Sequence, residues 1–556
     1  MHWTLPDRKD DDWKGKLDWA VMWEYLMLIV DGVAGAVVGT VWNCAASAIR
    51  DIKVRARRSR ISDDSDFPNS SCRHAMVQYK ISQRFMLTLV MLASGALIVP
   101  QLGLRSLWWD EAFSWWFTTV KLGDLWQIAW NHEELNMVLY QGLLNVWSRW
   151  GDSEFWLRLP SALFAVGAVW AVARLGRILF EPRVALTAAL LVALNGFLVV
   201  YGQEARAYSM LLFLATLSSY LLVCALKHGE PRYWFGFVVV SVLCGYTHFL
   251  GVLQVFSQIL IAGLLVYVAS GRVLTRLLIA AGFVLLGMLP IFWFVMTKRS
   301  QIDWIPRPTL GSLVLIMKSL AGGGGVMLLA FIPLVVFGFT RRYRDQMPIE
   351  GGGSFSPAAY VVLCFLVPIG LVFGISLVRP LTVPRYLIAT VAPLALAAAV
   401  GLMAIPHRAV RAAVLVAVTI LAFRSSAAQL ARVSSDFRSA TAYMLESAAP
   451  GDALMFCRPP AKTGFDYYAR DASFVPPTIY PMSPRPYHEP SFGEPGALSA
   501  DDLVTRAAGY DRVSMFCAHD KKGHGPRLLA AFENSHVILE DKDFSEIRVV
   551  RLQKRD

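Results

Sequence analysis

Charged residues are scarce in this chain of 556 residues: they make up 17% of it, against about 25% in a typical soluble protein. Hydrophobic residues make up 55%. This balance excludes a set of soluble domains and predicts a polytopic membrane protein. The signatures of common soluble enzymes are also missing, because the sequence contains no HExxH, P-loop, GxSxG or GxGxxG motif.

Cysteine is rare as well. The seven cysteines include no C-x-x-C pair and no zinc-ligand spacing. Lys and Arg total 53 against 41 Asp and Glu, a formal net charge of +12. These basic residues are scattered in short clusters between apolar runs, a pattern that suits membrane topology and anionic lipid rather than nucleic acid.

Long uncharged runs are what the chain has instead. The first runs from Phe85 to Gln101 after Lys80 and Arg84, and predicts a helix whose basic start lies in the cytoplasm. The run 233–271 is too long for one helix and is expected to fold back near His248. Further runs cover 159–173, 184–203, 207–226, 277–297, 319–340, 351–378, 386–406 and 409–424. The total is about eleven membrane-spanning helices, and an odd number puts the C-terminus outside.

Composition divides the chain into three parts. Residues 1–84 are predicted to be an N-terminal extension, either an amphipathic segment lying on the membrane or a stretch ahead of a natural start at Met76. Residues 85–425 hold the spans, and their first outer loop, 102–157, is rich in tryptophan and predicts helices in the membrane interface. Residues 426–556 are polar and predict an α/β domain. The fold class is therefore an all-α polytopic membrane bundle with a small C-terminal extracytoplasmic α/β domain.

The C-terminal part carries two similar strand-like segments, 452–457 and 512–517, preceded by helical stretches near 436–448 and 500–508. This alternation favours a parallel sheet. Cys457 and Cys517 end the two strands, and neighbouring strands would bring them within reach of a disulfide. A pair of unlinked buried thiols is the alternative.

Residues 107–117 place two adjacent carboxylates, Asp110 and Glu111, inside a run of aromatic residues. Aromatic residues collect where a membrane meets water, and an acidic pair held there is costly unless it binds or reacts with something. The pattern is interpreted as the mouth of an active site at the outer membrane face. The alternative is an ordinary outer loop whose acids are solvated.

Two more polar clusters fall on the same predicted face. They are residues 201–208, with Gln203, Glu204, Arg206 and Tyr208, and residues 379–386, with Arg379, Arg385 and Tyr386. His248 and the acidic patch 132–134 join them. Guanidinium forks suit phosphate and a partly dry carboxylate suits general-base work, so the clusters predict a site for a lipid-linked phosphate donor. The alternatives are a turn-capping pair, arginines that snorkel to the interface, and a buried hydrogen-bonded histidine.

The order of these features resembles the GT-C superfamily of membrane glycosyltransferases, which includes protein O-mannosyltransferases and lipid A aminoarabinose transferases. The resemblance covers roughly 85–425 and a similar appended outer domain. It rests on the acidic pair followed by 154–162 (EFWLRLPSA), 203–208 (QEARAY), 246–248 (YTH) and 384–386 (PRY). Relatives often have His-Pro-Pro-Leu where this chain has His132-Glu133-Glu134-Leu135, so the resemblance carries over neither an acceptor nor a metal-ligand set.

The resemblance implies a transferase for a hexosyl or pentosyl group that uses a polyprenyl-phosphate sugar as donor. Asp110 would be the catalytic base, and Glu111 would bind substrate or metal beside it. Arg206, Arg379 and Arg385 would contact the donor phosphate. The remaining substrate contacts would be Gln203, Glu204, Tyr208, His248 and Tyr386. No cofactor is required, although a divalent cation could bridge carboxylate and phosphate.

The implied setting is a bacterial cytoplasmic (inner) membrane, with the C-terminal domain periplasmic or extracellular and with membrane lipids, not nucleic acid, as partners. The product would belong to a cell-envelope glycan or lipopolysaccharide, or to a protein. A transporter or flippase, or a polymerase or ligase for lipid-linked sugars, is the alternative. The sugar, the acceptor, the metal and the oligomeric state stay open.

Overall fold

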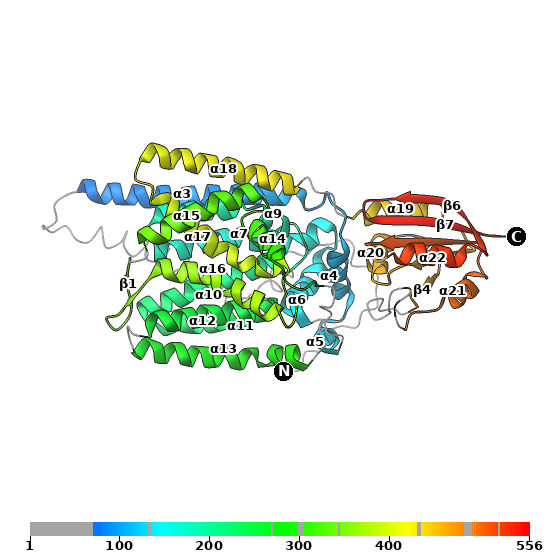
Figure 1. The fold of residues 1–556 in the computed structure, drawn as a ribbon, viewed down its shortest axis with the longest axis horizontal. Coiled ribbons are helices and arrows are strands. Elements are labelled where there is room, and N and C mark those ends of the chain that lie inside the picture. Colours follow the sequence, from blue (N-terminus) through cyan, green and yellow to red (C-terminus); the bar gives the residue numbers. More distant parts are fainter. Residues whose placement is uncertain are drawn as a thin grey trace.

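The computed structural model describes residues 70–131, 135–267, 271–297, 305–342, 345–430, 435–482, 492, 494, 496–520 and 523–555. Residues 1–69 of the predicted extension and the patch 132–134 lie outside this range. Figure 1 shows a bundle of helices lying side by side, with a smaller domain of strands and helices beyond one end.

Nine helices among the described residues are long and apolar enough to cross a membrane. They belong to α3 (Ser70–Ile98), α7 (Glu154–Leu179), α10 (Tyr208–His228), α12 (Phe249–Val266), α13 (Gly271–Thr297), α15 (Gly325–Arg342), α16 (Pro357–Ser376), η4 with α17 (Pro384–Thr390 and Val391–Met403) and α18 (Arg408–Leu430). The prediction of a multi-pass helical bundle is confirmed. Two of the predicted runs form shorter helices instead: 184–203 gives α8 (Pro182–Ala193) and α9 (Gly196–Tyr201), and the first half of 233–271 gives α11 (Pro231–Thr247).

Two breaks in the apolar runs are fixed by polar side chains. Asn195 ends α8 and caps α9, since its side chain accepts the N–H groups of Phe197 and Leu198. His248 ends α11 and caps α12 in the same way, because its Nδ1 accepts the N–H of Leu250 at 3.2 Å. The fold-back predicted near His248 is therefore confirmed.

Three short helices form a layer at the end of the bundle that faces the C-terminal domain (Figure 1). They are α4 (Trp109–Thr119), α5 (Leu122–Asn131) and α6 (Val138–Trp147). Asn145 of α6 donates to the carbonyl oxygens of Phe117 and Val120, both at 2.8 Å, and so ties α6 to the end of α4. These helices correspond to the interfacial segments predicted between 102 and 157.

The C-terminal domain is a five-stranded sheet in the order β4-β3-β5-β7-β6. Its strands are β3 (Asp452–Phe456), β4 (Thr478–Tyr480), β5 (Arg512–Ala518), β6 (His536–Asp543) and β7 (Ile547–Lys554). Helices α19 (Phe437–Glu446) and α20 (Ala461–Ala469) pack on one face, and α21 (Ala500–Ala507) and α22 (His524–Phe532) on the other. Every residue of β3 is buried because both faces are covered.

The predicted strands pair as parallel neighbours, with Asp452 opposite Arg512. The parallel arrangement favoured by the sequence holds for β4, β3 and β5 but not for the other edge of the sheet, where β7 runs antiparallel to both β5 and β6. A hairpin forms there because Ser545 and Glu546 adopt left-handed backbone conformations, with φ of 37° and 62°.

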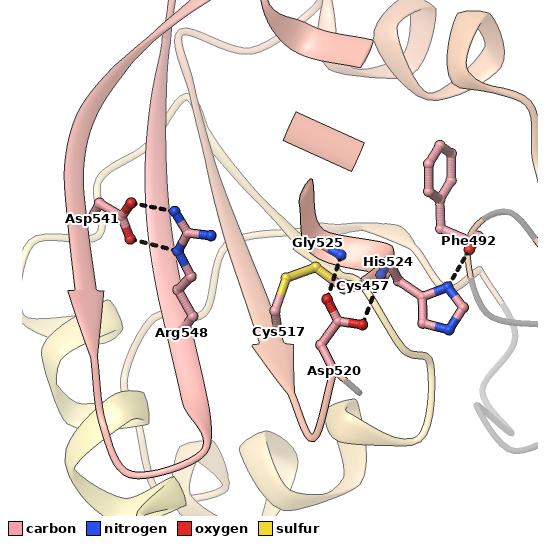
Figure 2. The surroundings of a disulfide bond; sticks show 8 residues. All are labelled: Cys457, Phe492, Cys517, Asp520, His524, Gly525, Asp541 and Arg548. Carbon is pink, nitrogen blue, oxygen red and sulfur yellow. Dashed lines mark hydrogen bonds and ion pairs between the residues drawn. A yellow bond between two sulfur atoms is a disulfide. The ribbon is translucent and has the colours of Figure 1, made fainter. Parts of the chain in front are cut away.

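Cys457 and Cys517 form a disulfide across the ends of β3 and β5, with their Cα atoms 5.0 Å apart. The predicted link is confirmed. Figure 2 shows the first turn of α22 beside it, where Asp520 accepts the N–H groups of His524 and Gly525 at 2.7 and 2.6 Å.

Candidate active site

Asp110 and Glu111 occupy the first turn of α4, where negative charge is stabilised by the helix dipole. Glu111 reaches back to the chain entering the helix, and its Oε2 accepts the N–H of Trp108 at 3.3 Å. The two carboxylates therefore leave the helix in different directions. That of Glu111 points into the protein, and that of Asp110 points toward Arg206 and Arg385.

Glu111 forms a buried two-pronged ion pair with Arg158 of α7. The Nε and Nη2 atoms of Arg158 donate to the two carboxylate oxygens, both at 2.7 Å, and the side chains are only 1% and 3% exposed. Glu111 also accepts the N–H of Ala205 at 2.8 Å. Arg158 also donates hydrogen bonds to the carbonyl oxygens of Leu102, Arg105 and Ser106. The pair thus joins α4, α7 and the turn 202–207.

Asp110 stands between two other arginines. Its Oδ2 lies 3.8 Å from Nη2 of Arg206 and 3.6 Å from Nη2 of Arg385. Arg206 is fixed by two further bonds, to the carbonyl oxygen of Asp110 at 3.1 Å and to the hydroxyl of Ser114 at 3.4 Å. The Asp110 side chain keeps 21% of its surface exposed, so this carboxylate, unlike Glu111, can meet a molecule from outside.

Aromatic rings surround the guanidinium of Arg385. Its central carbon lies 6.0 Å from the ring of Trp108, 5.8 Å from Tyr208 and 5.9 Å from Tyr386. His248 packs behind them, with its ring 4.9 Å from that of Tyr386. The rings limit the positions open to Arg385 and stabilise its charge.

Several buried polar atoms around Asp110 have no hydrogen-bond partner among the residues that the structure describes. They are Nε1 of Trp108, Oε2 of Glu204, Nε of Arg206 and Nε2 of His248. A buried polar atom without a partner costs about 1–3 kcal/mol, and a cluster of them is unusual in a folded protein. Hydroxyl and phosphate oxygens of a bound substrate are suitable partners for the three nitrogen donors.

Glu204 lies in the turn between α9 and α10, outside the membrane-spanning helices. Burial raises the pKa of its carboxyl to about 8, and the nearby charge of Glu111 acts in the same direction. Glu204 is therefore a neutral acid at pH 7, able to donate as well as accept a hydrogen bond.

A family model described as dolichyl-phosphate-mannose-protein mannosyltransferase matches residues 144–297. No curated protein sequence matches the chain. ArnT from Cupriavidus metallidurans in the apo state is similar in structure, with a TM-score of 0.57 and 11% identity over 86% of this chain and 98% of that one. ArnT from the same organism bound to undecaprenyl phosphate gives a TM-score of 0.54 and 11% identity over 84% and 97%.

The chain has the fold of the GT-C glycosyltransferases. The resemblance found in the sequence is thus confirmed for the fold, and the likeness extends over most of both chains. Asp110 stands in the first turn of α4, and α4 lies at the end of the bundle beside the C-terminal domain (Figure 1).

Six of the site residues predicted from the sequence gather about Asp110: Glu204, Arg206, Tyr208, His248, Arg385 and Tyr386. One other points elsewhere. Gln203 donates to the carbonyl oxygen of Leu97 at 3.2 Å, on α3. Arg379 follows α16, and its backbone N–H donates to the carbonyl oxygen of Ile375 at 2.9 Å; its predicted contact with a donor phosphate stays a prediction.

Sequence reasoning missed the ion pair that Arg158 forms at this site. The signal was a basic residue near the start of a long, mostly apolar helix, where such a charge needs a buried partner. Ser114 was also missed, since one serine among aromatic residues gives no signal of its own.

The C-terminal domain contacts α4 directly beside Asp110. Trp109 packs edge-on against the ring of His519, with centroids 5.6 Å apart, and Arg458 lies 4.6 Å above the tryptophan ring. Tyr468 of α20 accepts the N–H of Leu107 at 2.7 Å. The domain therefore lies over the approach to Asp110 from beyond the bundle.

Within the part of the chain that the structure describes, no group of three or more His, Cys, Asp or Glu side chains could hold a metal ion. Among the described residues, Arg206 and Arg385 supply the positive charges paired with Asp110.

Proposed function

We propose that the chain is a membrane glycosyltransferase that moves a sugar from a polyprenyl-phosphate donor to an acceptor at the outer face of the cytoplasmic membrane. The observation that carries the proposal is the pairing of one partly exposed carboxylate, Asp110, with two arginines within 4 Å. ArnT, which shares the fold, has been solved with undecaprenyl phosphate bound.

In the proposed reaction the acceptor hydroxyl or amine attacks the anomeric carbon of the sugar. The bond between that carbon and the phosphate oxygen breaks, and polyprenyl phosphate leaves with the electron pair. Asp110 takes the proton from the acceptor. Attack from the face opposite the phosphate inverts the anomeric centre.

Arg206 and Arg385 bind the departing phosphate. The phosphate gains a full negative charge as the bond breaks, so fixed guanidinium groups stabilise the transition state more than the bound donor. These two arginines supply the positive charge, and transfer is therefore proposed to proceed without an added divalent cation, including in the presence of a chelator.

Orientation follows from the basic loops at the far end of the bundle. Arg276 and Arg342 lie there, paired with Glu350 and Glu181, and Arg411 lines a cavity at the same end. Basic residues accumulate on the cytoplasmic side of membrane proteins. The site and the C-terminal domain are therefore proposed to lie outside the cytoplasm.

A sugar-transfer assay with purified protein and a panel of polyprenyl-phosphate sugars tests the proposal. A glycosylated acceptor together with free polyprenyl phosphate is the expected result. Movement of the intact lipid-linked sugar between leaflets without release of polyprenyl phosphate would instead identify a flippase.

A further inference from the structure

A cavity of about 540 Å³ lies at the end of the bundle away from Asp110. It is formed by the last turn of α15 with Asp345 beyond it, by the end of α17 and the residues 404–406 that follow it, and by the first turn of α18. Its charged lining consists of Arg341, Arg342, Arg411 and Asp345, and we call it the inner arginine pocket. Its volume falls within the range of known ligand sites.

Only one of the three guanidinium groups is neutralised by acids. Arg342 pairs with Glu181 at 3.1 Å and with Asp345 at 3.6 Å. Among the described residues, neither Arg341 nor Arg411 forms an ion pair. Arg341 lies over the ring of Phe337, and Arg411 makes a long bond of 3.5 Å to the carbonyl oxygen of Met403. The pocket therefore carries an excess of positive charge.

The dipoles of the helices stabilise the positive charges of two of these arginines but not that of the third. Arg341 and Arg342 stand in the last turn of α15, where the helix dipole stabilises cations. Arg411 stands in the first turn of α18, where the same dipole disfavours a cation. A half-buried arginine in that place needs another source of negative charge.

The two helices beside the pocket face lipid. Most of the membrane-spanning length of α15 and α18 is not buried in the protein, and the two helices pack against each other. Exposed apolar side chains run along both, including Ile332 and Val336 on α15 and Val416 and Ile420 on α18. A lipid whose anionic headgroup lies in the pocket could therefore place its acyl chains along this apolar surface.

We propose that the inner arginine pocket binds the phosphate headgroup of an anionic phospholipid from the adjoining leaflet. Guanidinium groups match phosphate oxygens in geometry as well as charge, and basic pockets between membrane helices on the cytoplasmic side bind such headgroups. The bound lipid joins the ends of α15, α17 and α18. This site is separate from Asp110 and does not depend on the proposed transferase reaction.

The test uses the full-length protein in neutral detergent, titrated with short-chain phosphatidylglycerol or phosphatidylcholine and followed by native mass spectrometry. We expect retention of phosphatidylglycerol in preference to phosphatidylcholine, and affinity weaker by roughly tenfold or more in the double variant Arg341→Gln/Arg411→Gln. Arg272→Gln is the matched control, because this exposed arginine starts α13 and lies outside the pocket lining. It should retain the lipid as the wild type does.

Equal retention of both lipids by the wild type, or equal loss in the double variant and in Arg272→Gln, would overturn the proposal. Inorganic phosphate forms a second arm. Phosphate that stabilises the protein as strongly as phosphatidylglycerol would assign the pocket to a soluble anion instead of a lipid. Thermal unfolding of the double variant in phosphatidylcholine vesicles should match the wild type, which separates loss of binding from loss of fold.

Discussion

Asp110 and Glu111 are neighbours in the chain and carry the same charge, yet they differ in burial and in the arginines that they contact. Glu111 is buried and engaged by Arg158 through both oxygens, while Asp110 is partly exposed and meets two arginines at longer distances. The sequence predicted an acidic pair at a site but not the ion pair between Glu111 and Arg158, because that contact depends on α7, whose Arg158 lies 47 residues away in the chain.

Replacing Asp110 by Asn keeps the shape of the side chain and removes the basic oxygen. General-base catalysis is worth about 10²–10⁴-fold, so we expect turnover to fall by that order while expression and donor binding persist. Single-turnover sugar transfer measures the change. Wild-type turnover in Asp110→Asn would remove Asp110 from the mechanism.

Arg385→Lys tests the grip on the donor phosphate. Lysine keeps the charge but loses the planar fork, and the loss of one charged hydrogen bond should weaken donor use roughly tenfold or more. Donor titration at a fixed acceptor concentration gives the effect. Arg379→Lys is the matched control on the same loop and should change donor use little; equal effects at both positions would favour a general role in anchoring helix ends.

Glu204 predicts a dependence on pH. The pKa of an ordinary exposed glutamate carboxyl is 4.5, and that of Glu204 in the folded chain is about 8. Between these two pH values the folded chain holds a proton that the unfolded chain has released. Stability is therefore full at low pH and falls as the pH rises through about 8. Thermal unfolding in detergent should show this fall in the wild type and a flatter profile in Glu204→Gln. The same slope in both proteins would assign the dependence to another group.

At the scale of elements, the sequence predicted those parts whose limits are set by local physics. A continuous apolar run too long for one helix had to break, and His248 supplied a capping side chain. Strands β6 and β7 were missed because half of β6 is charged. Their pairing depends on cross-strand contacts such as Arg548 with Asp541, at 2.5 Å, which no local pattern reveals.

The Glu111–Arg158 pair should hold α4 in place. Removing one partner of a buried ion pair leaves the other charge uncompensated, at a cost of about 3–5 kcal/mol. We expect Glu111→Gln to lower the thermal unfolding temperature clearly more than Asp110→Asn does. In a double-mutant cycle with Arg158→Gln the two losses should not add, whereas additive losses would indicate that the residues act separately.

For the whole molecule, the sequence predicted the bundle and the appended domain, but not that this domain would touch Trp109 through Arg458 and His519. Contacts between parts that are hundreds of residues apart leave no periodic trace in either part. The aromatic run around Asp110 suggested only a membrane interface, and part of it serves as a protein contact instead.

The side of the membrane is a prediction at this same scale. An outward C-terminal domain means that a reporter active only in the periplasm, fused after Asp556, should be active. The same fusion with a reporter active only in the cytoplasm should be silent. The opposite pattern would move Asp110 and the C-terminal domain together to the inner face, since α4, which carries Asp110, lies at the same end of the bundle as that domain (Figure 1).

The three-way link made by Glu111 affects how loss-of-function maps of this chain should be interpreted. A screen scored only by product would rank Glu111 and Arg158 beside Asp110, because disturbing the link shifts the backbone that carries Asp110 and the turn that carries Arg206. A position where substitution leaves activity unchanged can therefore be excluded from the catalytic machinery, whereas a position where substitution abolishes activity cannot be assigned to it on that result alone. Reagents that report on conformation, such as conformation-specific antibodies, would divide the inactive variants into two groups. In one group the reacting side chains are misplaced, and in the other a reacting side chain is missing.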